Sequence, residues 1–300
     1  MGEKQKKNNY MKTLILIDGN ALIHRAYHAL PPLITKKGEL INAVYGFTSI
    51  LLKVLKEFEP DYLACTFDLA GPTFRDIEYK EYKAKRVKPP QELYDQIPRI
   101  KEVVKSFDIP IFEKQGFEAD DIIGTLVSKI KAKPEIKSII VTGDLDTLQL
   151  VDDDKVVVYT MKKGIKDTII YNKESVIKRY GLEPKQIVDF KGLKGDSSDN
   201  ILGVPGIGEK TAVELLKKFG NLKNLYQDLG NADLNHKLKA KLLEYKEQAF
   251  FSQYLATIRK DAPIEFDLKK CQRGEFDREK AIRLFKELEF NSLINRLPVV

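Results

Sequence analysis

The chain has 300 residues, 43% of them hydrophobic, with two cysteines and a net charge of +7. This length allows one large domain with a helical addition. No apolar run approaches 18 residues, and no hydrophobic segment follows the charged N-terminus, which argues against a membrane protein and against a signal peptide. Cys65 and Cys271 lack a companion pair, which fits a reducing cytoplasm, where we expect the protein to act.

The basic balance, with 51 Lys and Arg against 44 Asp and Glu, is typical of proteins that bind nucleic acid or another polyanion. Many soluble proteins carry a similar charge without binding any polyanion, so the sum alone decides nothing. The distribution of the charges is more informative.

Strands and helices are predicted to alternate through the first half of the chain. Nearly continuous apolar runs that stop at turn residues predict strands, and segments with helical spacing lie between them. The predicted strands are residues 12–20, 61–68, 109–112, 137–144 and 155–160, and the predicted helices are 21–30, 43–58, 91–107 and 118–132. This order predicts an α/β fold with a parallel sheet covered on both faces.

The second half of the chain is predicted to be helical. Its helices are residues 173–180, 185–192, 208–219, 237–256 and 279–296. No linker rich in Pro and Gly separates the halves. We therefore expect a basic tail over residues 1–11, a core over 12–172 and a helical region over 173–300 that packs on the core.

Acidic residues recur at the predicted strand ends. Because the carboxyl ends of parallel strands meet at one edge of a sheet, these acids are expected to converge, together with those of "FEADD" and "GDSSDN". The set is Asp18, Asp68, Glu118, Asp120, Asp121, Asp144, Asp146, Asp196 and Asp199. A single strand-end Asp is more often a turn or cap residue, but nine convergent carboxylates predict bound divalent cations, with Mg²⁺ as the natural choice.

The acids of "FEADD" raise a geometric question. On a regular helix, positions 118 and 120 diverge by about 200°. Either Glu118 precedes the helix proper, or one of the acids caps the helix or supports a ligand instead of binding metal. Asp121 is the least certain ligand.

The segment "GVPGIGEKT" is predicted to bind phosphate. Gly206 and Gly208 permit a tight turn with outward N–H groups, and Lys210 and Thr211 open the helix that follows. The alternative is a plain corner between two helices. The spacing of Gly and Lys in this segment differs from that of a P-loop.

A basic segment over residues 73–90 interleaves six cations with aromatic residues, a composition that suits single-stranded nucleic acid. A solvated loop is the alternative. On the first helix, Arg25 either faces the crevice and meets a phosphate or lies on the surface. His24 and His28 lack the companions of a zinc site.

Six segments occur in the order and spacing of the bacterial 5′-nucleases of the flap endonuclease superfamily: "ILIDGNALIHRAYHAL", "YGFTSILLKVL", "FDLAGPTFRDIEYKEYKAKR", "GFEADDIIGTL", "VTGDLDTLQLV" and "GDSSDNILGVPGIGEKTAVELLKKFG". The sequence resembles this family over nearly its whole length. The resemblance implies a PIN-like α/β nuclease core, a helical arch at about residues 71–95, and a helix–three-turn–helix DNA-binding element.

The resemblance also implies an activity: metal-dependent hydrolysis of DNA phosphodiesters at 5′ flaps and 5′ ends during primer removal and repair. Two Mg²⁺ ions are expected, with Mn²⁺ as a substitute. By the family pattern, Asp18, Asp68, Glu118 and Asp120 surround one ion, Asp144, Asp146, Asp196 and Asp199 lean to the second, and Asp121 lies nearby. No side chain acts as the nucleophile.

The remaining implied roles concern DNA. Lys83 and Arg86 match the arch cations beside the reacting phosphate, and Arg75 and Arg25 are further expected DNA contacts. The hairpin of Gly206, Gly208, Lys210 and Thr211 matches the duplex-binding element, which in relatives holds K⁺. We expect a monomer that works with a DNA polymerase in cis or in trans.

The sequence disfavours two rival functions. A phosphatase of the haloacid dehalogenase type needs Asp two positions after its first strand-end Asp, and Asn20 stands there. A DNA-binding scaffold without catalysis is disfavoured by the complete set of carboxylates, because ligands should be lost first.

Overall fold

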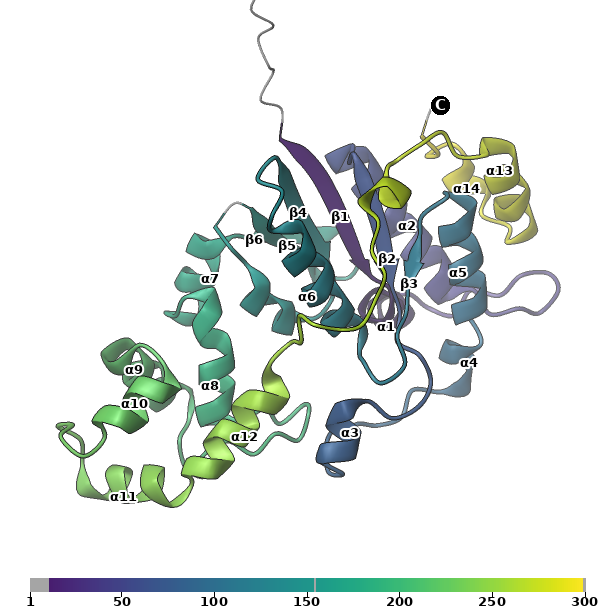
Figure 1. The fold of residues 1–300 in the computed structure, drawn as a ribbon. Helices are drawn as coiled ribbons and strands as arrows, with labels where there is room; N and C mark the ends of the chain where they lie inside the picture. The colour runs from purple at the N-terminus through teal and green to yellow at the C-terminus, as the bar shows by residue number, and fades with distance from the viewer. Residues whose placement is uncertain (1–10, 154, 299–300) are drawn as a thin grey trace, which may run out of the picture.

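The computed structural model describes residues 11–153 and 155–298. The predicted tail, residues 1–11, lies outside the described residues except for Met11. An α/β core fills one side of the molecule, and a group of helices from the second half of the chain projects from the other (Figure 1). No helix of the described residues is long and apolar enough to cross a membrane.

The core contains a six-stranded sheet in the order β3-β2-β1-β4-β5-β6. Its strands are β1 (Lys12–Asp18), β2 (Tyr62–Thr66), β3 (Ile111–Phe112), β4 (Ile136–Val141), β5 (Val156–Lys163) and β6 (Asp167–Tyr171). Strands β1 to β5 pair in parallel, which confirms the predicted parallel sheet. Strand β6 is antiparallel to β5 and was not predicted, because it is a short edge strand whose residues are mostly not buried.

Two apolar clusters cover the two faces of the sheet. Along β1, Ile15 and Ile17 point into one cluster and Leu14 and Leu16 into the other, as the twofold period of a strand requires. The helical elements of the first half are α1 (Gly19–Ala29), α2 (Asn42–Phe58), α3 (Phe74–Glu78), α4 (Gln91–Tyr94), α5 (Ile97–Ser106), α6 (Ala119–Ile130) and the 3₁₀ turn η1 (Leu145–Leu150). Helices α1, α2 and α5 contribute to the first cluster, and α6 and η1 contribute to the second.

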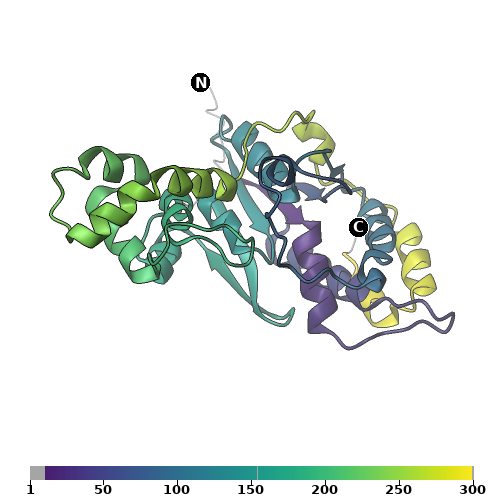
Figure 2. The same cartoon turned by 90° about the horizontal axis from the view of Figure 1, so that it is seen from below.

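The second half of the chain packs in two places. Its elements are α7 (Lys173–Tyr180), η2 (Pro184–Gln186), α8 (Ile187–Lys194), α9 (Glu209–Phe219), α10 (Leu222–Asp228), α11 (His236–Glu244), α12 (Lys246–Ala256), η3 (Leu268–Cys271), α13 (Arg278–Glu287) and α14 (Asn291–Ile294). Helices α8 to α12 contribute to a third apolar cluster, whereas α13 and α14 return to the first cluster beside α5 (Figure 2). Within residues 173–298, α8 to α12 and the pair α13 and α14 therefore pack in different clusters.

Three predicted helices are interrupted. Residues 91–107 divide into α4 and α5, residues 237–256 divide at Tyr245, and residues 279–296 divide near Glu289, which has a positive φ of 58°. Helix α10 was not predicted. Apolar spacing alone does not locate these breaks, because each half keeps the helical period.

The segment expected to form a helical arch, residues 71–95, is helical only at its two ends. Helices α3 and α4 flank turns and extended chain over residues 79–90. Lys83 takes a positive φ of 54° within these turns, a conformation incompatible with a continuing right-handed helix. We call residues 79–90 the basic turn.

Candidate active site

The carboxyl ends of β1, β2 and β4 bring three acids to one edge of the sheet, with Asp18 pairing beside Thr66 and Ile17 beside Val141. Helix α6 begins at the same edge. Together these elements line a cavity of about 440 Å³. Its acidic lining residues are Asp18, Asp68, Glu118, Asp120 and Asp144. The prediction that the acids converge is thus supported for these five, and their role as ligands stays a prediction.

Asp18 is held firmly at the end of β1. One carboxylate oxygen caps α1 by accepting from the Ala21 N–H at 3.0 Å, and the other accepts from the Thr142 hydroxyl at 2.7 Å. Burial raises the pKa of Asp18 to about 7, although both hydrogen bonds oppose the shift. A positive charge near this carboxylate would stabilise its ionised form.

Asp68 links two neighbouring elements. Its Oδ1 accepts from the Ala119 N–H at 2.6 Å, and its own N–H donates to Asn20 Oδ1 at 3.0 Å. The residue that argued against a phosphatase, Asn20, therefore orients the end of β2.

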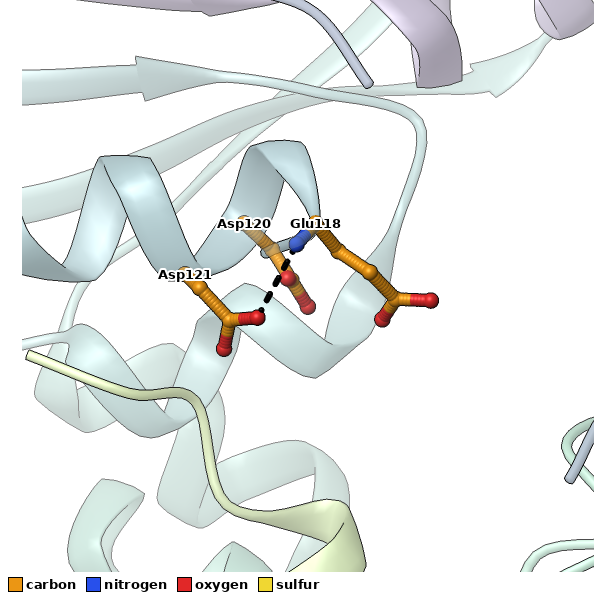
Figure 3. A group of neighbouring side chains, drawn as sticks. All are labelled: Glu118, Asp120 and Asp121. Carbon is orange, nitrogen blue, oxygen red and sulfur yellow. Dashed lines mark hydrogen bonds between the residues drawn. The ribbon is translucent and has the colours of Figure 1, made fainter. Parts of the chain in front are cut away.

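The three acids at the start of α6 point in different directions (Figure 3). Glu118 is the residue before the helix, which is the first of the two alternatives that the sequence left open. Asp121 turns back so that its Oδ2 accepts from the Glu118 N–H at 3.1 Å. Asp120 lies between them, with Oδ1 buried and without a hydrogen-bond partner among the described residues. Burial and the carboxylates of Asp121 and Glu118 raise the pKa of Asp120 well above its ordinary value.

Asp121 is unsuited to bind a metal ion. Its side chain is fully buried, and both oxygens receive hydrogen bonds from the Arg75 guanidinium, at 2.7 and 2.8 Å. The N–H groups of Glu118 and Arg259 donate to the same carboxylate. These four bonds occupy its acceptor capacity, so the structure argues against the predicted ligand role.

Arg75 does not lie at a DNA-binding surface. It is 2% exposed, and its N–H groups are directed at Asp121, Glu118 and two backbone carbonyls. The predicted DNA contact is wrong for this conformation, because a guanidinium with every donor paired inside the protein has none left for a phosphate.

The second group of acids is organised by a lysine that the sequence did not reveal. Lys191 of α8 donates to Asp146 and, at 2.6 Å, to Asp196. Burial and the nearby Asp144 raise the pKa of Asp146 to about 6. Burial also acts to raise the pKa of Asp196, but Lys191 and hydrogen bonds from Ser198 outweigh it and lower that pKa to about 2.

The basic turn lies against the acids. Lys83 donates to Glu118 Oε1, and Arg86 donates to Asp199 Oδ1. The Tyr82 hydroxyl is 3.1 Å from both Glu118 Oε2 and Asp199 Oδ2, and its single proton serves one of them at a time. Lys83 and Arg86 also line the 440 Å³ cavity together with the carboxylates.

Arg25 lines the same cavity, in agreement with the alternative in which it faces the crevice. Its Nε donates to the Gly164 carbonyl at 3.1 Å and its Nη2 to the Met161 carbonyl at 2.7 Å, which fix the side chain in place. His24 and His28 line the cavity as well, with their rings 6.5 Å apart.

The glycine hairpin lies between α8 and α9, away from the cavity. Val204 and Ile207 are buried anchors, whereas Gly206, Gly208 and Lys210 are exposed. Gly206 has a positive φ of 76°, as the predicted tight turn requires, and Gly208 caps α9. Thr211 follows in the first turn. Because Gly208 provides no side-chain cap, the N–H groups at the start of α9 are open to a phosphate.

The donor set fits hard divalent cations. The buried, unpartnered Oδ1 of Asp120 is costly unless a cation or proton neutralises it. Glu118, Asp120 and Asp121 offer oxygens within 4.8 Å of one another, but of these Asp121 is already saturated. Carboxylate oxygens are the ligands that Mg²⁺ and similar ions prefer. Cations held by such a group can activate water for the hydrolysis of a phosphodiester.

Lys191 and Thr142 were not predicted to contact the acids. The aromatic residues of segment 73–90 were expected to suit single-stranded nucleic acid, whereas the Tyr82 hydroxyl contacts Glu118 and Asp199. Thr142 lies 124 positions from Asp18 and directly after another strand of the sheet, and Lys191 lies 45 positions from Asp146, so no spacing pattern marks these contacts. The useful signal was chemical: so many convergent carboxylates require cationic and hydroxyl partners.

Two family models match the chain. One describes the 5′-3′ exonuclease N-terminal resolvase-like domain and covers residues 13–181, and the other describes the 5′-3′ exonuclease C-terminal SAM fold and covers residues 182–279. The boundary between them falls after α7, close to the predicted division at residue 172.

Among curated proteins, the chain is 47% identical to DNA polymerase I of Bacillus subtilis over 286 residues, which cover 95% of this chain and 32% of that protein. It is also 47% identical to DNA polymerase I of Chloroflexus aurantiacus, over 96% of this chain and 31% of that protein. The chain thus spans about a third of the length of the curated relatives that it matches.

Solved structures share the fold. A T5 5′-exonuclease with bound zinc is 21% identical, with a TM-score of 0.69 over 93% of this chain and 99% of that one. The catalytic core of Rad2 in complex with DNA substrate is 19% identical, with a TM-score of 0.60 over 96% and 93%. At these identities the likeness shows the fold alone.

Proposed function

The chain belongs to the 5′-3′ exonuclease family, and from this premise we propose that it hydrolyses DNA phosphodiesters at 5′ flaps and 5′ ends, beside junctions of single strand and duplex, in primer removal and repair. The cut leaves a 5′-phosphate on the downstream fragment.

The observation that carries the proposal is the composition of one cavity. Five carboxylates from three strand ends and the start of α6 line one cavity of about 440 Å³ together with the cations Arg25, Lys83 and Arg86. A phosphodiester in this cavity would meet both positive charge and metal-binding oxygens.

We propose that two Mg²⁺ ions, with Mn²⁺ as a substitute, bind among the carboxylates. Asp18, Asp68, Glu118 and Asp120 would hold one, and Asp144, Asp146, Asp196 and Asp199 would hold the second. When bound, such a pair activates a water molecule and stabilises the leaving oxygen. The unpartnered oxygen of Asp120 and the raised pKa of Asp18 support this assignment.

The cations of the basic turn would exchange partners during the reaction. Lys83 and Arg86 bind Glu118 and Asp199 through long side chains, and a phosphate in the cavity would compete for both. They would then neutralise the reacting phosphate, and Arg25, fixed by two carbonyls, would contact a neighbouring phosphate.

The glycine hairpin would hold the duplex. Gly206 and Gly208 leave the backbone exposed, and Lys210 and Thr211 add donors at the start of α9. K⁺ at the hairpin remains part of the proposal.

A DNA polymerase is the proposed partner, in cis or in trans, because the matched relatives are DNA polymerases I about three times as long as the matched segment. That the protein is a monomer and acts in the cytoplasm stays a prediction.

A labelled 5′-flap duplex tests the proposal. With Mg²⁺ we expect a cut next to the junction that leaves a 5′-phosphate, and with chelator we expect none. A blunt duplex and a 3′-flap duplex are the controls. Equal cleavage of all three, or a cut that persists in chelator, contradicts the proposed function.

A further inference from the structure

Arg75 makes an unusually complete set of contacts for a residue at the base of the basic segment. Its Nε donates to the Leu255 carbonyl at 2.8 Å, and Nη2 donates to the Thr257 carbonyl at 3.0 Å and to Asp121 at 2.8 Å. Its Nη1 donates to Asp121 at 2.7 Å and to Glu118 at 3.2 Å. The five N–H groups of the guanidinium thus each have a partner.

Arg75 and its partners belong to three parts of the molecule. Arg75 lies on α3, Asp121 and Glu118 lie at the start of α6, and the two carbonyls lie at the end of α12 and directly after it. Asp121 adds a bond of its own to the chain after α12, from the Arg259 N–H at 2.8 Å.

Aromatic contacts reinforce the junction of α3 and α12. The Phe74 ring lies 4.5 Å from Arg75 Cζ and 5.3 Å from Arg259 Cζ, and it meets Tyr254 edge to face. Tyr79 meets Phe251 of α12 in the same way.

Helix α12 connects Arg75 to the glycine hairpin through its packing on α8. It packs so closely on α8 that a Cβ atom at Gly192 would lie 3.0 Å from the Ala249 carbonyl. Helix α8 ends directly before the acids Asp196 and Asp199, and the hairpin follows them. A continuous packed path therefore joins the hairpin, α12, Arg75 and the acids of α6.

We infer that the Arg75–Asp121 pair is a positioning clamp. It holds Glu118 and Asp120 at a fixed position relative to the end of α12. The inference rests on the proposed function. Glu118 shares Arg75 Nη1 with Asp121, and Asp120 lies between the two bound carboxylates. A fully buried ion pair adds little net stability over apolar residues of similar volume. We therefore ascribe to this pair a role in the geometry of the site and not in the stability of the fold.

Two conservative variants test the clamp. Arg75→Lys keeps the charge and removes the planar fork, and Asp121→Asn keeps the shape and removes the charge. Arg99→Lys is the matched control, because Arg99 also pairs with several carboxylates, Glu39, Glu102 and Glu287, away from the cavity.

Binding of Mn²⁺ is measured by calorimetry without DNA, together with flap cleavage in Mg²⁺, flap affinity in chelator, and thermal unfolding. Each clamp variant should weaken Mn²⁺ binding and lower kcat by about 10-fold or more, as loss of a group that orients a ligand does. KM and flap affinity in chelator should stay unchanged. The double variant should be no worse than the stronger single variant, and the control should lower only the melting temperature.

Three results would overturn the clamp. Loss of Mn²⁺ binding in Asp121→Asn but not in Arg75→Lys would make Asp121 a ligand. Weaker flap binding by Arg75→Lys, with a smaller dependence on salt, would make Arg75 a DNA contact. A lower melting temperature with unchanged Mn²⁺ binding and kcat would leave the pair a support of the fold only.

If a clamp variant does not fold, Phe74→Leu removes the ring on the guanidinium without changing charge, and it should give the same pattern more weakly; no change in Mn²⁺ binding would count against the clamp. Absence of flap cleavage by the unmodified protein would reject the proposed function, and the calorimetric comparison would still decide the clamp.

Discussion

The carboxylate cavity and the glycine hairpin contrast in how they are built. The cavity collects side chains from β1, β2, β4 and α6, and its acids are held by hydrogen bonds from elements distant in sequence. The hairpin is one continuous segment that presents backbone and one lysine, Lys210, on the surface. We therefore expect chemistry to depend on the first region and DNA affinity on the second, with separable losses.

The largest expected effect is loss of catalysis from Asp120→Asn. Removing this charge takes away a proposed metal ligand with an otherwise unpartnered oxygen. Cleavage should fall on the order of 10³-fold or more, because a bound metal would supply several kcal/mol of transition-state stabilisation. Single-turnover cleavage of a 5′ flap measures the rate. Flap affinity in chelator should be retained, and an equal loss of both would erase the contrast between the two regions.

The converse effect is expected from Gly206→Ala. A side chain at a φ of 76° strains the turn by about 1–2 kcal/mol, and the new Cβ would meet Lys241 Nζ. Flap affinity should fall by roughly 10-fold, while the single-turnover rate at saturating DNA stays near that of the unmodified protein. Fluorescence anisotropy gives the affinity.

Gly181→Ala provides the matched control for this prediction. Gly181 also has a positive φ, of 69°, and also faces a lysine tip, that of Lys217, but it caps α7 outside the hairpin. It should lose similar stability without losing affinity. Equal losses of affinity in both variants would show that strain alone explains the Gly206 result.

Stability of the metal-free protein should depend on pH through the cavity. Asp18 has a pKa of about 7 and Asp146 of about 6 in the folded state, against 3.8 in the unfolded chain. The folded state therefore holds more protons, and stability falls as pH rises from about 4 to 7. In chelator the melting temperature should drop by roughly 5 °C over this range.

Mg²⁺ should reverse that drop, with a larger gain at pH 8 than at pH 5, because it favours the ionised carboxylates. Asp18→Asn keeps an acceptor for the cap of α1 and should flatten the pH profile. A melting temperature in chelator that does not change with pH would contradict the assignment of burial as the dominant cause.

The smallest effect is expected from Lys210→Gln. This exposed lysine in the first turn of α9 is proposed to contact one phosphate, so affinity should fall a few-fold and the salt slope should decrease by about 1. Titrations at several salt concentrations measure the slope. An unchanged slope would remove Lys210 from the proposed DNA contacts while leaving the hairpin backbone in place.

Local pattern was sufficient for much of the fold. The apolar runs of β1, β2 and β4 and the acids that end them could be read directly, because a buried strand and its terminal turn are properties of neighbouring residues. Strand β6 and the breaks near Tyr245 and Glu289 were missed, since edge strands and positive φ values are decided by packing.

The sequence by itself determined that acids would gather at the carboxyl edge of a parallel sheet and that a glycine hairpin would follow them. Only the tertiary structure decided what each acid does. Asp120 and Asp121 are neighbours of the same type, yet one has an unpartnered oxygen and the other is saturated by Arg75 and Arg259. The reason is physical: charge is a property of a residue, whereas the groups that compensate it are brought by folding, for Asp121 from 46 and 138 positions away.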